Sequence, residues 1–106
     1  MYAWMITKDH ITREGSNAAG LVGPSGTTIE AIKALNAISV IAIEELPLNC
    51  EAFRMYDDDN TLYYEGLIIG DRDTDGFEPL DDYGEPGAGC TRIDYWSQTD
   101  KRWEIL

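Results

Sequence analysis

A string of alternating aspartates, Asp71-Arg72-Asp73-Thr74-Asp75-Gly76, is the part of this sequence whose spacing comes closest to a known chemistry. Calcium-binding loops place carboxylate oxygens at alternate positions and use glycine at the sixth position for a sharp turn. The pattern departs from an EF-hand at its eighth and ninth positions, Glu78 and Pro79, and its flanks do not read as helices. A divalent-cation site of another type is the alternative function, with Asp71, Asp73, Asp75 and Asp82 as candidate ligands.

Other reactive residue types do not gather into a catalytic signature. His10, beside Asp9, could act as a general base, but no recognisable nucleophile motif accompanies it. The glycine-rich residues 20–26 resemble a phosphate-binding loop without its lysine. One histidine and two distant cysteines, Cys50 and Cys90, make no zinc cluster. We therefore expect no enzymatic activity and no cofactor, and we expect two unpaired thiols.

Negative charge is concentrated in the second half of the chain. Residues 1–50 carry five acidic and three basic residues, whereas residues 51–106 carry fifteen and five. Seven of the acids fall between Asp71 and Glu85, with only Arg72 against them. A field of this sign repels nucleic acid and membrane surfaces and attracts cations or basic protein surfaces. The charge therefore predicts a basic partner and argues against direct nucleic-acid binding.

The first half of the chain reads as one strand, one loop and one helix. Residues 2–6 are aromatic and β-branched enough for a strand, and residues 13–26 form a loop rich in glycine. Thr27 and Glu30 match a capping box, which predicts a helix from there to about residue 38. Residues 39–43 either continue this helix or begin a short strand.

The second half reads as antiparallel sheet. Phe53 and Met55 alternate onto one face of a strand, as do Ile93 and Tyr95. A turn rich in aspartate at residues 57–60 predicts a hairpin. The expected strands are residues 51–56, 61–69, 90–96 and 102–106, with a long acidic loop at residues 70–89. Together these elements predict an α+β fold, with one α-helix packed on a mostly antiparallel β-sheet.

Length and composition indicate how many domains the chain forms and where it is expected to be located. The 106 residues fit a single domain, residues 1–106, and the apolar fraction of 43% is ordinary for a globular protein. No run of 18 apolar residues suggests a membrane-spanning helix, and the N-terminus does not resemble a signal peptide. We expect a cytoplasmic location.

Four stretches resemble a group of small bacterial proteins with no assigned activity, some of them from phage or plasmids. The stretches are Met1–Ile11, Phe53–Asp59, Leu62–Gly66 and Asp75–Gly84. Because the resemblance brings no assigned activity, it assigns no catalytic residue to this chain. It implies an origin in mobile elements, where small acidic proteins include anti-CRISPR and anti-restriction inhibitors that present carboxylates in place of phosphates.

These observations lead to one functional hypothesis. The protein is expected to be a non-catalytic interaction module whose acidic face blocks a basic, nucleic-acid-binding surface of another protein. Because the acidic turn and the acidic loop border the same hairpin, they are expected to form one contiguous face. The candidate partner-binding residues are Asp57, Asp58, Asp59, Asp71, Asp73, Asp75, Asp81 and Asp82, with Tyr83 as an aromatic anchor.

Overall fold

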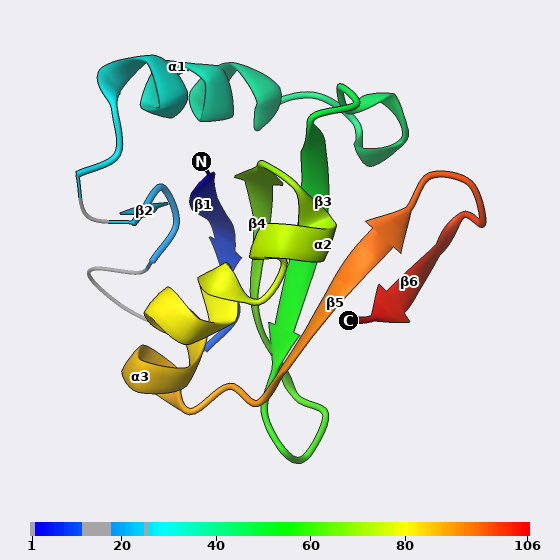
Figure 1. Cartoon of the computed structure of the whole chain (residues 1–106). Helices are drawn as coiled ribbons and strands as arrows, with labels where there is room; N and C mark the ends of the chain where they lie inside the picture. The colour runs from blue at the N-terminus through cyan, green and yellow to red at the C-terminus, as the bar shows by residue number, and fades with distance from the viewer. Residues whose placement is uncertain (1, 12–17, 25) are drawn as a thin grey trace.

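A six-stranded antiparallel sheet, in the order β2-β1-β4-β3-β5-β6, forms the centre of the molecule (Figure 1). The computed structural model describes residues 2–11, 18–24 and 26–106. The expected α+β fold, with a helix packed on a mostly antiparallel sheet, is confirmed. The strands are β1 (Ala3–Asp9), β2 (Val22–Gly23), β3 (Cys50–Tyr56), β4 (Leu62–Ile69), β5 (Arg92–Ser97) and β6 (Arg102–Ile105).

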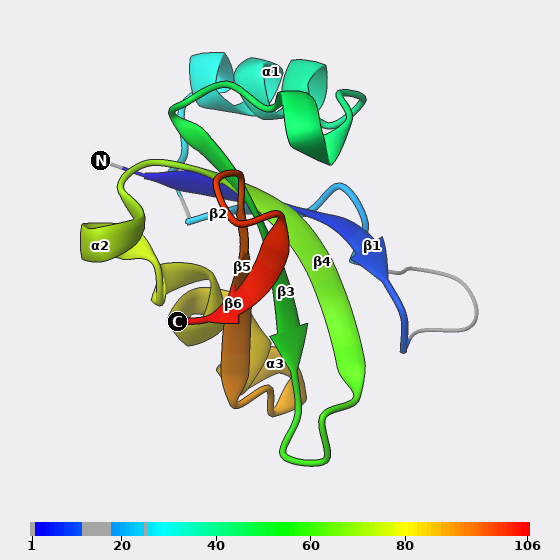
Figure 2. The same ribbon diagram turned by 90° about the vertical axis from the view of Figure 1, so that its right-hand side faces the viewer.

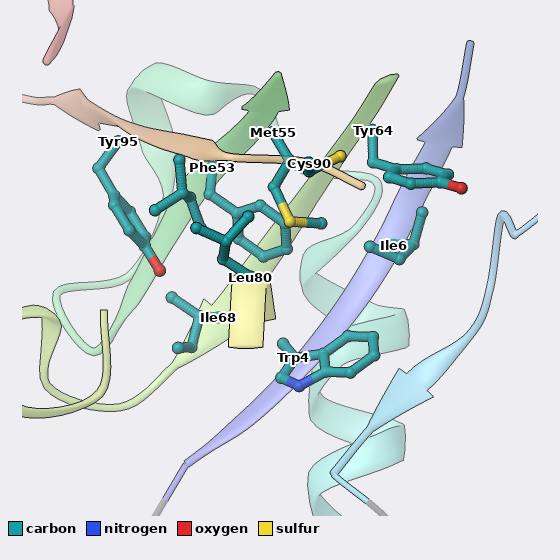
Figure 3. Packing of buried hydrophobic residues seen from close by; sticks show 10 residues of the cluster. Trp4, Ile6, Phe53, Met55, Tyr64, Ile68, Leu80, Cys90 and Tyr95 are labelled. Carbon is teal, nitrogen blue, oxygen red and sulfur yellow. The ribbon is translucent and has the colours of Figure 1, made fainter. Parts of the chain in front are cut away.

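Alternation along the strands divides the apolar residues between the two faces of the sheet. Phe53 and Met55 share a face of β3, and Ile93 and Tyr95 share a face of β5, as predicted, and the structure places all four on the same face of the sheet. With them lie Trp4, Ile6, Tyr64, Ile68, Leu80 and Cys90 (Figure 3). The second cluster, on the opposite face, consists of Ala3, Met5, Leu35, Ile38, Cys50, Ala52 and Leu67. Both faces of the sheet are therefore covered by apolar packing over part of their area.

Helix α1 (Ile29–Ile38) covers one end of the second face, where it buries Leu35 and Ile38 (Figure 2). Its N-cap is Thr28, whose side chain accepts a hydrogen bond from the Ala31 amide at 3.2 Å, so the predicted cap at Thr27 is one residue too early. Residues 39–43 neither extend the helix nor form a strand, because a turn leads into the short 3-10 helix η1 (Ile43–Glu45).

The segment predicted as a long acidic loop is largely helical, and this prediction was wrong. It contains α2 (Arg72–Asp75), the π-helical turn η2 (Leu80–Gly84) and α3 (Glu85–Ala88). These elements lie against the first face of the sheet, opposite α1 (Figure 2). Leu80 of η2 is buried there at 6% exposure. The segment is consequently part of the folded core and not a solvated connection.

The glycines and the proline described below, which suggested a loop, are compatible with the helical conformation of this segment. Gly84 allows close approach to the sheet, since a Cβ at that position would lie 2.6 Å from the Met55 sulfur. Pro86 sits at the start of α3, where its missing N–H is tolerated. Gly89 ends α3 in the left-handed conformation, with φ of 76°.

The two cysteines are free thiols, as predicted. Cys50 belongs to the second cluster and Cys90 to the first, so they lie on opposite faces of the sheet. Burial raises the pKa of each thiol to about 11. Of the predicted loop at residues 13–26, residues 13–17 and 25 lie outside the described residues, and Val22–Gly23 form the short strand β2.

Candidate protein-interaction surface

The segment from Asp71, the N-cap of α2, to the end of α3 carries seven carboxylates and one base, and the base faces the sheet. Arg72 lies with its guanidinium carbon 5.2 Å from the centre of the Tyr95 ring. Its nitrogens lie 3.7 Å from a Glu51 oxygen and 3.5 Å from a Glu104 oxygen. Arg72 is thus paired with acids of β3 and β6, and its positive charge does not neutralise the carboxylates of the segment itself. We call Asp71, Asp73, Asp75, Glu78, Asp81, Asp82 and Glu85 the acidic segment.

Exposure separates the members of the acidic segment. Asp75 and Glu78 are half-buried, while the other five are exposed. Asp71 also has a local structural role, because its carboxylate accepts hydrogen bonds from the Asp73 amide at 3.0 Å and the Thr74 hydroxyl at 3.1 Å, which caps α2. Asp73, Asp81 and Glu85 are therefore the better residues for testing a charge effect on binding.

Two acids of the segment hold the first strand. The Tyr2 hydroxyl lies 2.9 Å from Asp82 Oδ2 and 3.0 Å from Glu78 Oε2. The indole Nε1 of Trp4 donates to the same Asp82 oxygen at 2.9 Å. Burial and these hydrogen bonds from Tyr2 raise the pKa of its hydroxyl above the ordinary value, because ionisation would add a charge beside two carboxylates. Asp82 thus fixes η2 to β1.

Tyr83 is a packing residue and not an exposed anchor. Its ring lies between those of Trp4 and Tyr64, with centroid distances of 5.8 Å and 5.2 Å. Phe77, which the sequence did not single out beside Tyr83, is 52% exposed next to α2. In the sequence, this exposure was indicated only by the position of Phe77 between Gly76 and Glu78, among the acids. Phe77 is the aromatic residue of this segment that a partner could contact.

The acidic turn at residues 57–59 lies apart from α2. In the β3–β4 hairpin, Tyr56 pairs with Leu62 at one end and Cys50 pairs with Ile69 at the other. Asp57 therefore follows β3 at the first end, whereas Asp71 follows β4 at the second (Figure 1). The expectation that the two clusters share one face because both border this hairpin therefore does not hold for α2, which lies at the opposite end of the hairpin from Asp57.

Asp57 also has a structural role in its turn. Its Oδ1 accepts hydrogen bonds from the amides of Thr61 and Asp59, each at 2.9 Å. The bond from Thr61 is the main reason that the pKa of Asp57 lies below its ordinary value. Asp58 and Asp59 are exposed. Of this cluster, only the latter two present carboxylates that are free to be changed without disturbing the turn.

The candidate cation ligands do not form a calcium loop. Residues 72–75 adopt a single helical turn capped by Asp71, whereas a calcium loop wraps its oxygens around an ion. Asp82 lies in η2, where Tyr2 and Trp4 donate to it. Within residues 2–11, 18–24 and 26–106, no group of three or more His, Cys, Asp or Glu side chains could hold a metal ion.

His10, the candidate general base, is paired with Glu65 and not with a nucleophile. Its Nε2 lies 2.7 Å from Glu65 Oε2, and the other oxygen of Glu65 accepts from Arg54 Nε at 3.2 Å. Burial raises the pKa of Glu65, but these two hydrogen bonds together with the positive charges of Arg54 and Lys8 hold it below the ordinary value. The arrangement is an ion-pair cluster on the sheet surface.

Comparisons with protein-family models, curated proteins and solved structures gave no match. In the part of the chain that the structure describes, no helix has the length and apolar character needed to cross a membrane. The surface of the molecule is therefore the feature that indicates its function.

Proposed function

We propose that this protein is a non-catalytic interaction module whose acidic segment binds a basic surface of another protein. One observation carries the proposal. Among the described residues, the carboxylates of the helical segment have no ion pair with a base, and its own base, Arg72, is turned to the sheet and paired with Glu51 and Glu104. The net charge of the whole chain, −12, exceeds what solubility requires of a small domain.

The segment combines charge with one apolar contact. Exposed charges at an interface mainly accelerate encounter and set its salt dependence. An aromatic side chain that becomes buried in a pocket of the partner contributes most to holding the complex together. Phe77, exposed among the acids, supplies this contact. Because the helical backbone packs on the sheet, it keeps the carboxylates and Phe77 in fixed relative positions, which lowers the entropic cost of binding.

We further propose that the basic surface is a nucleic-acid-binding groove, which the acidic segment occupies by presenting carboxylates where phosphates would lie. Such grooves are lined with lysine and arginine and depend on many phosphate contacts. The resemblance to small proteins of phage and plasmids supports an inhibitor of this kind. Blocking by charge and shape requires no catalytic residue and no cofactor.

Two triple variants with equal changes in charge test the proposal. Asp73, Asp81 and Glu85, all exposed, are replaced by lysine in the first variant. The matched control replaces Glu44, Asp58 and Asp59, which are exposed on η1 and on the β3–β4 turn. Each triple raises the net charge by six. Immobilised protein is used to capture binding proteins from a bacterial lysate at low salt, before and after addition of nucleic acid.

The first triple variant should lose the captured protein, and the control should retain it. Nucleic acid should compete with the parent for that protein. Equal loss in both variants would show that binding follows net charge alone, and undiminished capture by the first variant would contradict the role of the acidic segment. Capture that nucleic acid does not disturb would contradict the groove-blocking form of the proposal while leaving the interaction module intact.

A further inference from the structure

The last strand of the sheet, β6, has one uncovered edge. It is the terminal strand in the sheet order and pairs with β5 on its other side. In Figure 2, β6 is the element nearest the viewer, and no other ribbon passes in front of it. Side chains here are accessible, since Arg102 is 69% and Ile105 is 67% exposed. An uncovered strand edge offers a row of backbone donors and acceptors to another strand.

The pairing register shows which backbone groups this edge offers. Ile105 stands opposite Asp94, and the Leu106 amide donates to the Ile93 carbonyl at 3.1 Å. This combination makes Asp94–Ile105 a non-hydrogen-bonded pair of the antiparallel ladder. By alternation, the N–H and C=O groups of Trp103 and Ile105 are directed away from β5. They are available to a further strand.

Charge near β6 is balanced, unlike that of the acidic segment. Residues 92–106 contain three bases and three acidic side chains, whereas residues 71–85 contain one base and seven acids. Two copies of a chain with a net charge of −12 would repel each other over most of their surface. The β6 edge is a place where that repulsion is locally small. Balanced charge therefore makes a second copy a possible occupant of the edge.

We propose that two copies of this protein pair through β6 in antiparallel orientation, with Trp103 opposite Trp103 of the second copy. This register directs the free backbone groups of Trp103 in the two copies toward each other and sets Ile105 opposite Lys101 of the second copy. It also places Arg102 of each copy opposite Glu104 of the other, giving two cross-strand pairs of opposite charge. Pairing Trp103 with Ile105 of the second copy would instead set the two Glu104 carboxylates against each other. The alternating charges of β6 thus select one register.

Pairing of this kind would place two acidic segments on the same side of a joined sheet. The two-fold axis of an antiparallel pair stands perpendicular to the sheet, so equivalent faces of both copies point in the same direction. A dimer would consequently present its acidic segments as a bivalent surface, which raises the effective affinity for a partner with two basic sites.

Sedimentation equilibrium and light scattering of the whole chain test the dimer. The parent protein should have about twice the chain mass of 11.9 kDa at micromolar concentrations. Arg102→Glu should weaken dimerisation at least tenfold, because like charges then meet in both cross-strand pairs. Lys33→Glu, an equal change of charge on the exposed side of α1, should leave the dimer unchanged.

Mixing two variants gives the sharpest result. Arg102→Glu and Glu104→Arg should each be monomeric alone, whereas an equimolar mixture should form a heterodimer with both charge pairs restored. Thermal unfolding of each variant verifies folding, since Glu104→Arg also removes a contact to Arg72. A monomeric parent at all concentrations would overturn the proposal. So would a parent dimer that Arg102→Glu and Lys33→Glu affect equally. If Glu104→Arg fails to fold, the comparison of the other two variants decides.

Discussion

The indole Nε1 of Trp4 donates a hydrogen bond to Asp82 Oδ2 at 2.9 Å, and this contact joins the first strand to the helical segment 78 residues later in the chain. Trp4 is only 3% exposed, so its N–H has little access to water. An acid that the sequence places among candidate partner contacts is therefore also a structural residue. Reversing the charge of such an acid therefore changes folding stability as well as the charge of this surface.

Replacing Asp82 by alanine should destabilise the protein by about 1–3 kcal/mol, because a buried donor loses its partner. For a domain of about this size, each kcal/mol lowers the melting temperature by roughly 4–8 °C. Asp81→Ala is the matched control, since Asp81 is an exposed neighbour. Thermal unfolding followed by circular dichroism compares the two. Equal melting temperatures would show that the bond to Trp4 contributes nothing.

Tyr83→Ala should lower the free energy of unfolding by about 2 kcal/mol, somewhat below the range for a fully buried aromatic residue. The ring fills the space between Trp4 and Tyr64, which would lose their contacts. Phe77→Ala should change stability much less, because that ring is half exposed, yet it should speed dissociation from a partner. Urea unfolding measures the first effect and surface plasmon resonance the second. The reverse assignment of effects would restore Tyr83 as the anchor.

Both thiols should resist a soluble disulfide reagent in the native state. Burial holds the pKa of Cys50 and Cys90 at about 11, so the reactive thiolate is scarce at pH 7.5, and the fold also restricts access. Ellman's reagent should release no colour from the native protein within minutes and should detect both thiols after denaturation. Rapid reaction of either thiol in the native state would contradict the packing of the two clusters.

The sheet was predictable from the sequence and the acidic helices were not, for a physical reason. Alternation in β3 and β5 follows directly from burial of one face, so Phe53, Met55, Ile93 and Tyr95 identified their strands. In the segment from Gly70 to Gly89, five glycines and two prolines indicated a loop. Gly84 is needed there for close packing against Met55, a long-range contact that local sequence does not reveal.

The candidate site was predictable in part for a similar reason. The concentration of acids between Asp71 and Glu85 is a property of the sequence, and the structure arranges it along one helical segment. Which acids are free and which hold the fold depends on contacts across the chain. Examples are Asp82 with Trp4, and Arg72 with Glu51 and Glu104.

In the proposed function, the acidic segment, and not net charge, binds a basic partner. The most direct test is the dissociation constant of a purified captured protein for the parent and for the two triple variants, measured at low and high salt. The account predicts that affinity of the parent falls steeply as salt rises. It predicts that the variant with lysine at Asp73, Asp81 and Glu85 binds at least tenfold more weakly at low salt, while the control binds as the parent does. Equal dissociation constants for the two variants would contradict it.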